Sequence, residues 1–241
     1  LSPRTKIIAN GDDLNIQKLF TLGVWSEIDY FGSSFSDSRK WTCVLDDRGQ
    51  YNLSLNGKKL EPIHSKLFGQ HNMLNVTAAI ASLSNLGLSP RELMASAQNF
   101  IGVKRRLEYL GKFSNIHLFD DFAHHPTAIK ASMAAMKSKF HSSRLYAVVE
   151  LASNTMRKGS LKSDLTESFH DADFVWILDF GDAEWDIQKE FLGIENVGIA
   201  KNMDDLSDQL WSKLKVDDSL VIMTNKDSVG IRNILIKGPQ S

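Results

Sequence analysis

The sequence of 241 residues contains one cysteine, Cys43, and only five prolines. A single cysteine excludes an internal disulfide and a zinc site built from cysteines, and it suits a reducing compartment. No apolar run approaches the roughly 20 residues that a membrane helix needs. The first residues also lack the basic and apolar regions of a secretory signal. We therefore expect a cytoplasmic protein that has no membrane partner.

Charge of one sign is not in excess either, because 28 Lys and Arg residues stand against 29 Asp and Glu residues. Without a broad positive field, nucleic acid is not an expected partner. The hydrophobic fraction of 42% is that of an ordinary globular protein. The chain has no initiator Met and leads directly into an apolar segment at 6–10, so we expect a piece of a longer polypeptide.

Two regions differ in their pattern of predicted strands and helices, and we place their boundary between residues 103 and 104. In the first we expect a strand at 6–10, a helix at 12–20, helices at 71–87 and 90–100, and turns at Arg48-Gly49 and Asn56-Gly57, the former joining a hairpin of 41–47 and 51–55. In the second we expect strands at 116–120, 144–151, 174–180, 197–200 and 218–225, with helices at 126–140, 160–172, 183–192, 203–214 and 228–237. Strands that alternate with helices predict an α/β fold with a doubly wound, mostly parallel sheet. Ligands of such sheets bind beyond the carboxyl ends of the strands.

The first polar motif is GQHNMLNVTAAIA at 69–81. Asn75 shares one face of the predicted helix with His71 and Asn72, at its N-terminus. An amide offers a donor and an acceptor, which the edge of adenine requires. Capping of the helix by Asn, with a buried polar His, explains the same spacing.

The second motif, GVKRRLEYLG at 102–111, places Lys104, Arg105 and Arg106 next to one another. Adjacent residues cannot all point at a common site. A guanidinium beside a phosphate suits phosphoryl transfer, in which one such Arg contributes roughly 10³–10⁵ in rate. A solvated basic run at a domain junction is the alternative.

The third motif, DDFAHHPTAI at 120–129, follows a predicted strand directly. A carboxylate such as Asp121 can bind ribose hydroxyls. Asp120, Asp121, His124 and His125 could instead ligate a transition metal. A third interpretation is that Asp121 caps the following helix and the His pair orients it.

The fourth motif, ELASNTMRKG at 150–159, follows the next strand and is expected at the same edge of the sheet. Ser153, Asn154 and Thr155 can bind a polar substrate. Arg157 can pair with a carboxylate. By composition alone this segment is an ordinary polar loop.

Together, HNMLN before an Ala-rich helix, RRLE, DDFAHHPTAI and E-x-x-SNTM, in this order, resemble the Mur ligase family over nearly the whole chain. The resemblance implies the end of the family's central ATP-binding domain in residues 1–103 and its Rossmann-like C-terminal domain in 104–241. The family's phosphate-binding motif G-x-x-G-K-[ST] is absent from this sequence. The resemblance therefore implies a fragment that is inactive alone.

The activity that the resemblance implies is ATP-dependent amide formation with Mg²⁺. The residues of DDFAHHPTAI and SNTM most resemble those of the family member that joins the tripeptide L-Ala-γ-D-Glu-meso-diaminopimelate to UDP-N-acetylmuramate in peptidoglycan recycling. A carboxylate would attack the γ-phosphate to give an acyl phosphate, and the peptide amine would then displace phosphate.

The resemblance also implies roles for individual residues. His71, Asn72 and Asn75 would contact adenine, and Asp121 would hold the ribose. The implied catalytic residues are Arg106 at the phosphate and His124 and His125 near the reacting groups. The peptide would be bound by Ser153, Asn154, Thr155 and Arg157, and no protein residue is expected to ligate a metal.

Two segments depart from the family pattern. Leu151 and Ala152 stand where E-P-R-S-N-T-M has Pro and Arg, and TNKDSVGI at 224–231 replaces a Gly-rich segment and adds Lys226. If the missing Arg binds a carboxylate, a pair worth roughly 1.5–3 kcal/mol is lost. The departures leave open another peptide substrate or a non-catalytic binding relative. A metal-dependent hydrolase built on Asp120, Asp121, His124 and His125 is a further alternative.

Overall fold

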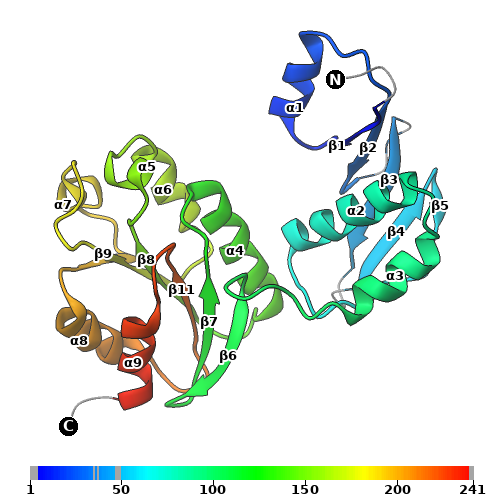
Figure 1. Ribbon diagram of the computed structural model, residues 1–241. Coiled ribbons are helices and arrows are strands. Elements are labelled where there is room, and N and C mark those ends of the chain that lie inside the picture. The colour runs from blue at the N-terminus through cyan, green and yellow to red at the C-terminus, as the bar shows by residue number, and fades with distance from the viewer. Residues whose placement is uncertain (1–4, 35, 37, 47–49, 239–241) are drawn as a thin grey trace. The chain divides into compact units, whose positions relative to one another are not determined.

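The computed structural model describes residues 5–34, 36, 38–46 and 50–238. The predicted turn at Arg48-Gly49 lies outside these residues. The chain forms two compact units, Leu1–Gly102 and Val103–Ser241, here called the N-terminal and C-terminal units (Figure 1). Among the described residues, no helix has the length and apolar character needed to cross a membrane.

The N-terminal unit contains a sheet of five strands in chain order, and the predicted hairpin is its third and fourth strands. The strands are β1 (Ile7–Asn10), β2 (Ile28–Gly32), β3 (Arg39–Leu45), β4 (Tyr51–Leu55) and β5 (Lys58–Lys59). The first three are parallel and the last two pairings are antiparallel. Asn56 and Gly57 both have positive φ, 49° and 75°. That is the backbone of a type I′ turn, so the predicted turn is confirmed.

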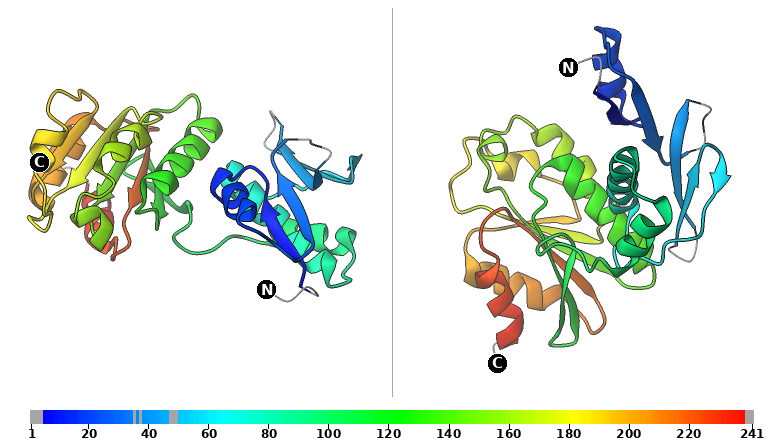
Figure 2. Two further views of the ribbon diagram at one scale, coloured as in Figure 1. Left: turned by 90° about the horizontal axis from the view of Figure 1, so that it is seen from above. Right: turned by 45° about the vertical axis from the view of Figure 1, so that its right-hand side comes forward.

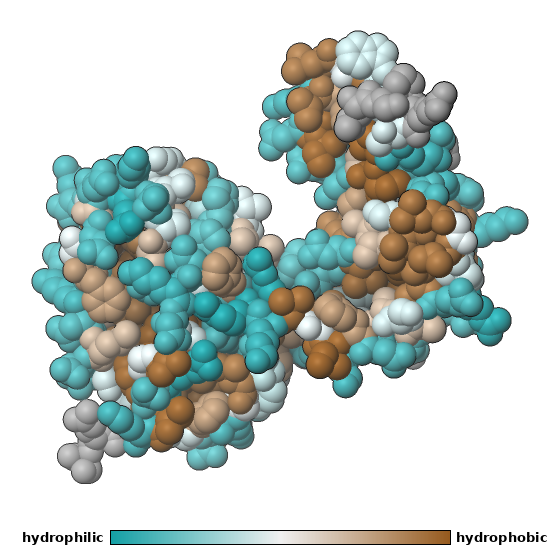
Figure 3. All heavy atoms as spheres, in the orientation of Figure 1, coloured by the Kyte–Doolittle hydropathy of each residue, from teal (hydrophilic) through white to brown (hydrophobic). Residues whose placement is uncertain are grey.

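Three helices accompany this sheet, and the prediction of each is confirmed to within two residues. They are α1 (Leu14–Thr21), α2 (Gln70–Asn85) and α3 (Pro90–Asn99). The Asp13 carboxylate accepts hydrogen bonds from the Asn15 and Ile16 amides, which fixes the start of α1. Helix α2 contributes Met73 and Ile80 to the core. By contrast α1 buries no residue, and hydrophobic side chains gather on the surface over it (Figure 3).

The C-terminal unit contains a six-stranded sheet in the order β10-β9-β8-β11-β7-β6. The strands are β6 (Glu108–Phe113), β7 (Ile116–Asp121), β8 (Leu145–Glu150), β9 (Phe174–Leu178), β10 (Val197–Ala200) and β11 (Ser219–Met223). All are parallel except β6, which pairs antiparallel with β7. Strand β6 was not predicted, because its sequence EYLGKF mixes polar and apolar residues and none of them is buried. The doubly wound α/β fold is confirmed.

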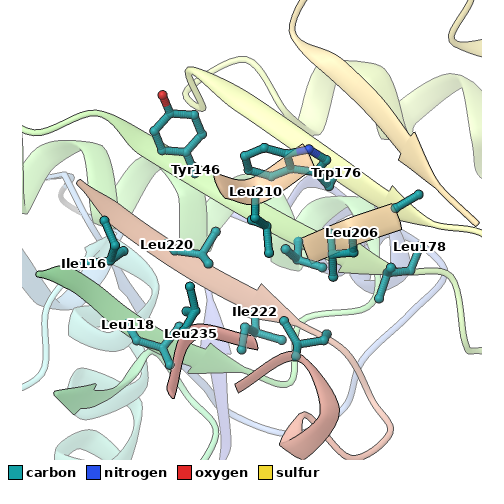
Figure 4. Packing of buried hydrophobic residues seen from close by; sticks show 13 residues of the cluster. Ile116, Leu118, Tyr146, Trp176, Leu178, Leu206, Leu210, Leu220, Ile222 and Leu235 are labelled. Atoms are coloured by element: carbon teal, nitrogen blue, oxygen red, sulfur yellow. The ribbon is translucent and has the colours of Figure 1, made fainter. Parts of the chain in front are cut away.

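Helices cover both faces of this sheet. They are α4 (Pro126–Lys139), α5 (Asn154–Arg157), α6 (Lys162–Ser168), α7 (Ile187–Glu190), α8 (Met203–Lys213) and α9 (Val229–Lys237). Figure 2 shows α4 and α6 on one face, with α8 and α9 on the other. On the second face Leu206 and Leu210 of α8 and Leu235 of α9 pack on Trp176 and Leu220 (Figure 4). The predicted helices at 160–172 and 183–192 are shorter than expected, because turns flank α6, and α7 lies between a bend and a turn.

Candidate functional site

Three polar segments meet at the carboxyl edge of the C-terminal unit's sheet. Strand β11 lies between β7 and β8, and Met223 is in register with both Asp121 and Val149. The residues that follow these strands are therefore neighbours. Thr224, after β11, shows this directly, because its hydroxyl donates to Glu150 Oε2 at the end of β8 over 2.5 Å.

Asp120 lies on the α9 face of β7 and is fully buried. Its Oδ2 accepts a hydrogen bond from Ser228 Oγ at 2.7 Å. The same oxygen lies 3.3 Å from a terminal nitrogen of Arg232 and 3.5 Å from Nε of Arg105. Two guanidinium groups thus compensate a carboxylate that would otherwise be costly to bury. Asp120 fastens the start of α9 and the Arg105 segment to the sheet.

Asp121 lies on the opposite, α4 face of β7, because neighbouring side chains alternate across a strand. Its Oδ2 accepts hydrogen bonds from the Leu107 amide at 3.0 Å and from Ser132 Oγ at 3.1 Å, and its Oδ1 accepts one from the Ala123 amide at 2.6 Å. Burial raises the pKa of Asp121, and these hydrogen bonds oppose that rise. The carboxylate therefore holds together the segments on both sides of β7.

The side chains of the three adjacent basic residues point in different directions, as predicted. Lys104 and Arg106 are exposed, whereas Arg105 turns inward and donates to the Thr224 carbonyl oxygen at 2.6 Å. Arg105 and Leu107 both have left-handed backbone, with φ of 59° and 47°. Each is held in that uncommon conformation by a hydrogen bond from its amide, Arg105 to Glu108 and Leu107 to Asp121. Arg106 is thus presented to solvent from a fixed turn.

The two histidines at the start of α4 offer different ring nitrogens. His124 Nδ1 lies 2.8 Å from the Phe122 carbonyl oxygen. A carbonyl only accepts, so Nδ1 carries a proton, and in the neutral ring Nε2 is the acceptor. His125 caps α4 instead, because its Nδ1 accepts from the Thr127 amide at 3.2 Å. A neutral His125 therefore carries its proton on Nε2.

The polar loop after β8 forms the short helix α5. Ser153 is its N-cap and accepts a hydrogen bond from the Met156 amide. Asn154 Oδ1 accepts one from the Arg157 guanidinium at 2.7 Å, while Thr155 is exposed. The predicted substrate residues thus lie on one turn, and the Arg157 guanidinium is held by Asn154.

A small pocket lies beside this turn. Leu151 and Ala152 line it together with Glu150, Phe180 and Lys226. The Lys226 ammonium lies 3.1 Å from Glu150 Oε1 and 3.9 Å from Asp182 Oδ2. The departures from the family pattern therefore meet in one pocket, where Lys226 brings a positive charge beside Ala152.

The predicted adenine residues all lie in the first two turns of α2, in the N-terminal unit. Asn72 Nδ2 donates to the Phe68 carbonyl oxygen at 2.9 Å, and Asn75 is exposed. His71 is half-buried. The N-cap residue is Gly69, with no side-chain cap, so the capping explanation for the Asn residues does not hold.

A metal site of the predicted kind is not formed. Asp120 and Asp121 point to opposite faces of the sheet, and His125 Nδ1 caps a helix. Within residues that the structure describes, no three His, Cys, Asp or Glu side chains gather as metal ligands. The metal-dependent hydrolase therefore lacks a ligand set in this part of the chain.

Sequence reasoning missed the partners that fix the site. Ser228 and Arg232 hold Asp120 from α9, more than 100 residues away. Glu150 and Thr224 join β8 to β11. A carboxylate at the last position of a buried strand, as in Glu150, was the available signal for a partner on the neighbouring strand.

Comparison with known proteins adds the family. The model of the Mur ligase glutamate ligase domain matches residues 105–225. A ligase from Escherichia coli K12, UDP-N-acetylmuramate–L-alanyl-γ-D-glutamyl-meso-2,6-diaminoheptandioate ligase, is 32% identical over 97% of this chain and 51% of its own length. The murein peptide ligase of Psychrobacter arcticus is 30% identical, with a TM-score of 0.73 over 98% of this chain and 52% of that chain.

A third similarity shows the fold alone. The MurF ligase of Thermotoga maritima, in complex with ADP, has a TM-score of 0.71 at 15% identity, over 98% of this chain and 54% of that chain. The chain spans about half the length of these relatives. The match to the family model and the similarity to the E. coli ligase agree with the order of the four motifs, and the chain belongs to the Mur ligase family.

Proposed function

We propose that the chain is the C-terminal part of a cytoplasmic, ATP-dependent ligase that joins L-Ala-γ-D-Glu-meso-diaminopimelate to UDP-N-acetylmuramate. The observation that carries the proposal is the 32% identity to the E. coli ligase across 97% of the chain. The exposed Arg106 on its fixed turn supports the same function. In recycling of cell-wall peptides, such an enzyme would reuse a released tripeptide.

The reaction proceeds in two steps. The lactyl carboxylate attacks the γ-phosphorus, which breaks the bond to ADP and gives an acyl phosphate. The peptide amine then attacks the acyl carbon, loses a proton and expels phosphate. In both steps negative charge develops on phosphate oxygens, and a guanidinium fixed beside them stabilises it. Arg106 has that role, and Nε2 of His124 is the acceptor available for the proton of the amine.

Four polar side chains are assigned to the nucleotide. Asp121 Oδ1 accepts one hydrogen bond from within the chain, so its second lone pair can accept one from a ribose hydroxyl. His71, Asn72 and Asn75 are assigned to adenine. Mg²⁺ would neutralise charge on the phosphates, but the described residues offer it no group of three ligands. The proposal therefore assigns none of them to the metal.

The peptide is assigned to the turn after β8. Ser153, Asn154 and Thr155 carry hydroxyl and amide groups, and Arg157 faces Asn154. Lys226 supplies a cation in the pocket that Ala152 lines, and it can pair with a peptide carboxylate. His125 Nε2 is a donor for the reacting groups.

The experiment measures amide synthesis by the longer protein that contains this chain. With ATP, Mg²⁺, UDP-N-acetylmuramate and the tripeptide, we expect UDP-N-acetylmuramoyl-tripeptide and ADP in equal amounts. The 241-residue chain alone should give neither, since it lacks G-x-x-G-K-[ST]. If product forms from another peptide but not from this tripeptide, that other peptide is the substrate. If no peptide gives product, the protein is a non-catalytic relative of the ligases.

A further inference from the structure

Arg106 is placed on a fixed turn, but its own side chain is long and exposed. An Arg side chain has many rotamers, and a phosphate site needs its guanidinium in one place. The Cζ atom of Arg106 lies 5.6 Å from the centroid of the Phe122 ring. That separation is within the range of a cation–π contact.

Phe122 is itself held at three points. Its amide donates to the Arg105 carbonyl oxygen at 2.8 Å. Its ring centroid lies 5.2 Å from the Arg105 Cζ, and Arg105 is anchored to Thr224 and Asp120. The ring also meets the His124 ring edge to face, with centroids 5.3 Å apart and planes at 82°. The ring is therefore a fixed surface.

Phe122 also holds His124 through its backbone, because its carbonyl oxygen accepts from Nδ1 of that histidine at 2.8 Å. One residue thus contacts two side chains that the proposed reaction uses. The ring contacts Arg106, and the carbonyl selects the tautomer of His124 that leaves Nε2 as an acceptor.

We infer that Phe122 is a positioning residue, whose ring holds the Arg106 guanidinium in the orientation that the phosphoryl group requires. The inference rests on the proposed function. It does not make Phe122 a catalytic residue, since the ring carries no group that takes part in the chemistry. The aromatic ring is the feature that matters, and an aliphatic side chain of similar size cannot replace it.

The test compares Phe122→Leu with Phe122→Tyr in the longer protein. We expect Phe122→Leu to lower kcat about tenfold, with KM for the tripeptide unchanged, and Phe122→Tyr to restore kcat to within about twofold. In an Arg106→Ala background, Phe122→Leu should cause a much smaller further loss, because its main effect passes through Arg106. An equal loss in both backgrounds, or an unchanged kcat, would overturn the inference.

A second measurement needs no ligase activity. In the 241-residue chain, the side-chain NMR resonances of Arg106 should be shifted upfield by the Phe122 ring. Phe122→Leu should abolish that shift, while Phe122→Tyr should keep it. Unshifted Arg106 resonances in the wild-type chain would refute the contact. If the shift is present but the longer protein makes no product, the proposed function fails and the contact stands.

Discussion

The two units differ in how completely their sheets are covered. In the C-terminal unit every residue of β8 and β11 is buried, because helices pack on both faces. In the N-terminal unit only one residue of β1 and two of β4 are buried. Leu14 at the start of α1, and Leu22 and Trp25 after its end, are largely exposed. The C-terminal unit thus contains a complete core of its own, whereas the hydrophobic surface of the N-terminal unit is only partly covered.

This difference extends to the residues proposed to act. In the C-terminal unit, the buried carboxylates Asp120 and Asp121 fix the segments that carry Arg106 and His124. In the N-terminal unit, the assigned residues lie on the first turns of one helix, and Asn75 is exposed. The backbone segments that carry Arg106 and His124, the residues we propose for the phosphate and the reacting groups, are thus held within the C-terminal unit.

The largest expected effect comes from matched Leu→Ala substitutions in the two units. Leu220 of β11 is fully buried in the core that α8 and α9 cover, whereas Leu14 is 67% exposed. Leu220→Ala should lower the free energy of unfolding of its unit by about 3–5 kcal/mol, since it leaves a cavity. Leu14→Ala should change it by less than about 0.5 kcal/mol. Urea unfolding measures both, and similar costs would remove the contrast between the units.

The next largest effect on the free energy of unfolding is expected when a buried and a partly exposed carboxylate are each removed. Asp121→Ala leaves the buried amides of Leu107 and Ala123 without acceptors and should cost about 3 kcal/mol of unfolding free energy. Asp12 accepts from the Ser33 amide and pairs with Arg39, but is partly exposed. Asp12→Ala should therefore cost about 1 kcal/mol.

In the longer protein, Asp121→Ala should also weaken ATP binding, as measured by calorimetry. An unchanged affinity for ATP would remove Asp121 from the ribose.

The thiol of Cys43 allows unfolding of the N-terminal unit to be measured separately, because the C-terminal unit has no cysteine. Burial raises the pKa of Cys43 from 9.0 to about 11. Below pH 9 the thiol is protonated in both states. Between pH 9 and 11 the unfolded chain loses the proton first, so stability falls by as much as about 3 kcal/mol. The difference in unfolding free energy between wild type and Cys43→Ala should show this fall. A constant difference across that range would mean that the thiol is not buried.

The smallest effect concerns the start of α1. Asp13→Ala removes the acceptor for two amides and should cost about 1 kcal/mol. Because α1 buries no residue, we expect the loss to appear as faster amide exchange in α1, with little change in β3 or β4. Slower amide exchange in α1 than in β3 would contradict the description of α1 as weakly packed.

The sequence predicted the features that depend on local chemistry. The Asp13 cap, the Asn56-Gly57 turn and the alternation of apolar strands with helices all report on short segments. It did not predict β6, whose residues are half polar because it is an edge strand. The predicted strand ended at residue 120, so the divergence of Asp120 and Asp121 on opposite faces of β7 was missed. Their partners Ser228 and Ser132 could not be predicted, because these pairings join segments distant in sequence.

We propose that Arg106, held at the carboxyl edge of the C-terminal unit's sheet, acts on the transferred phosphate. The most direct test measures kcat for amide synthesis by the longer protein with Arg106→Ala and, as a matched control, Lys104→Ala. Both residues are basic and exposed, and only one amino acid lies between them. We predict a loss of roughly 10³-fold or more for Arg106→Ala, with kcat of Lys104→Ala within about threefold of wild type. Equal losses for the two variants, or full activity of Arg106→Ala, would contradict the claim.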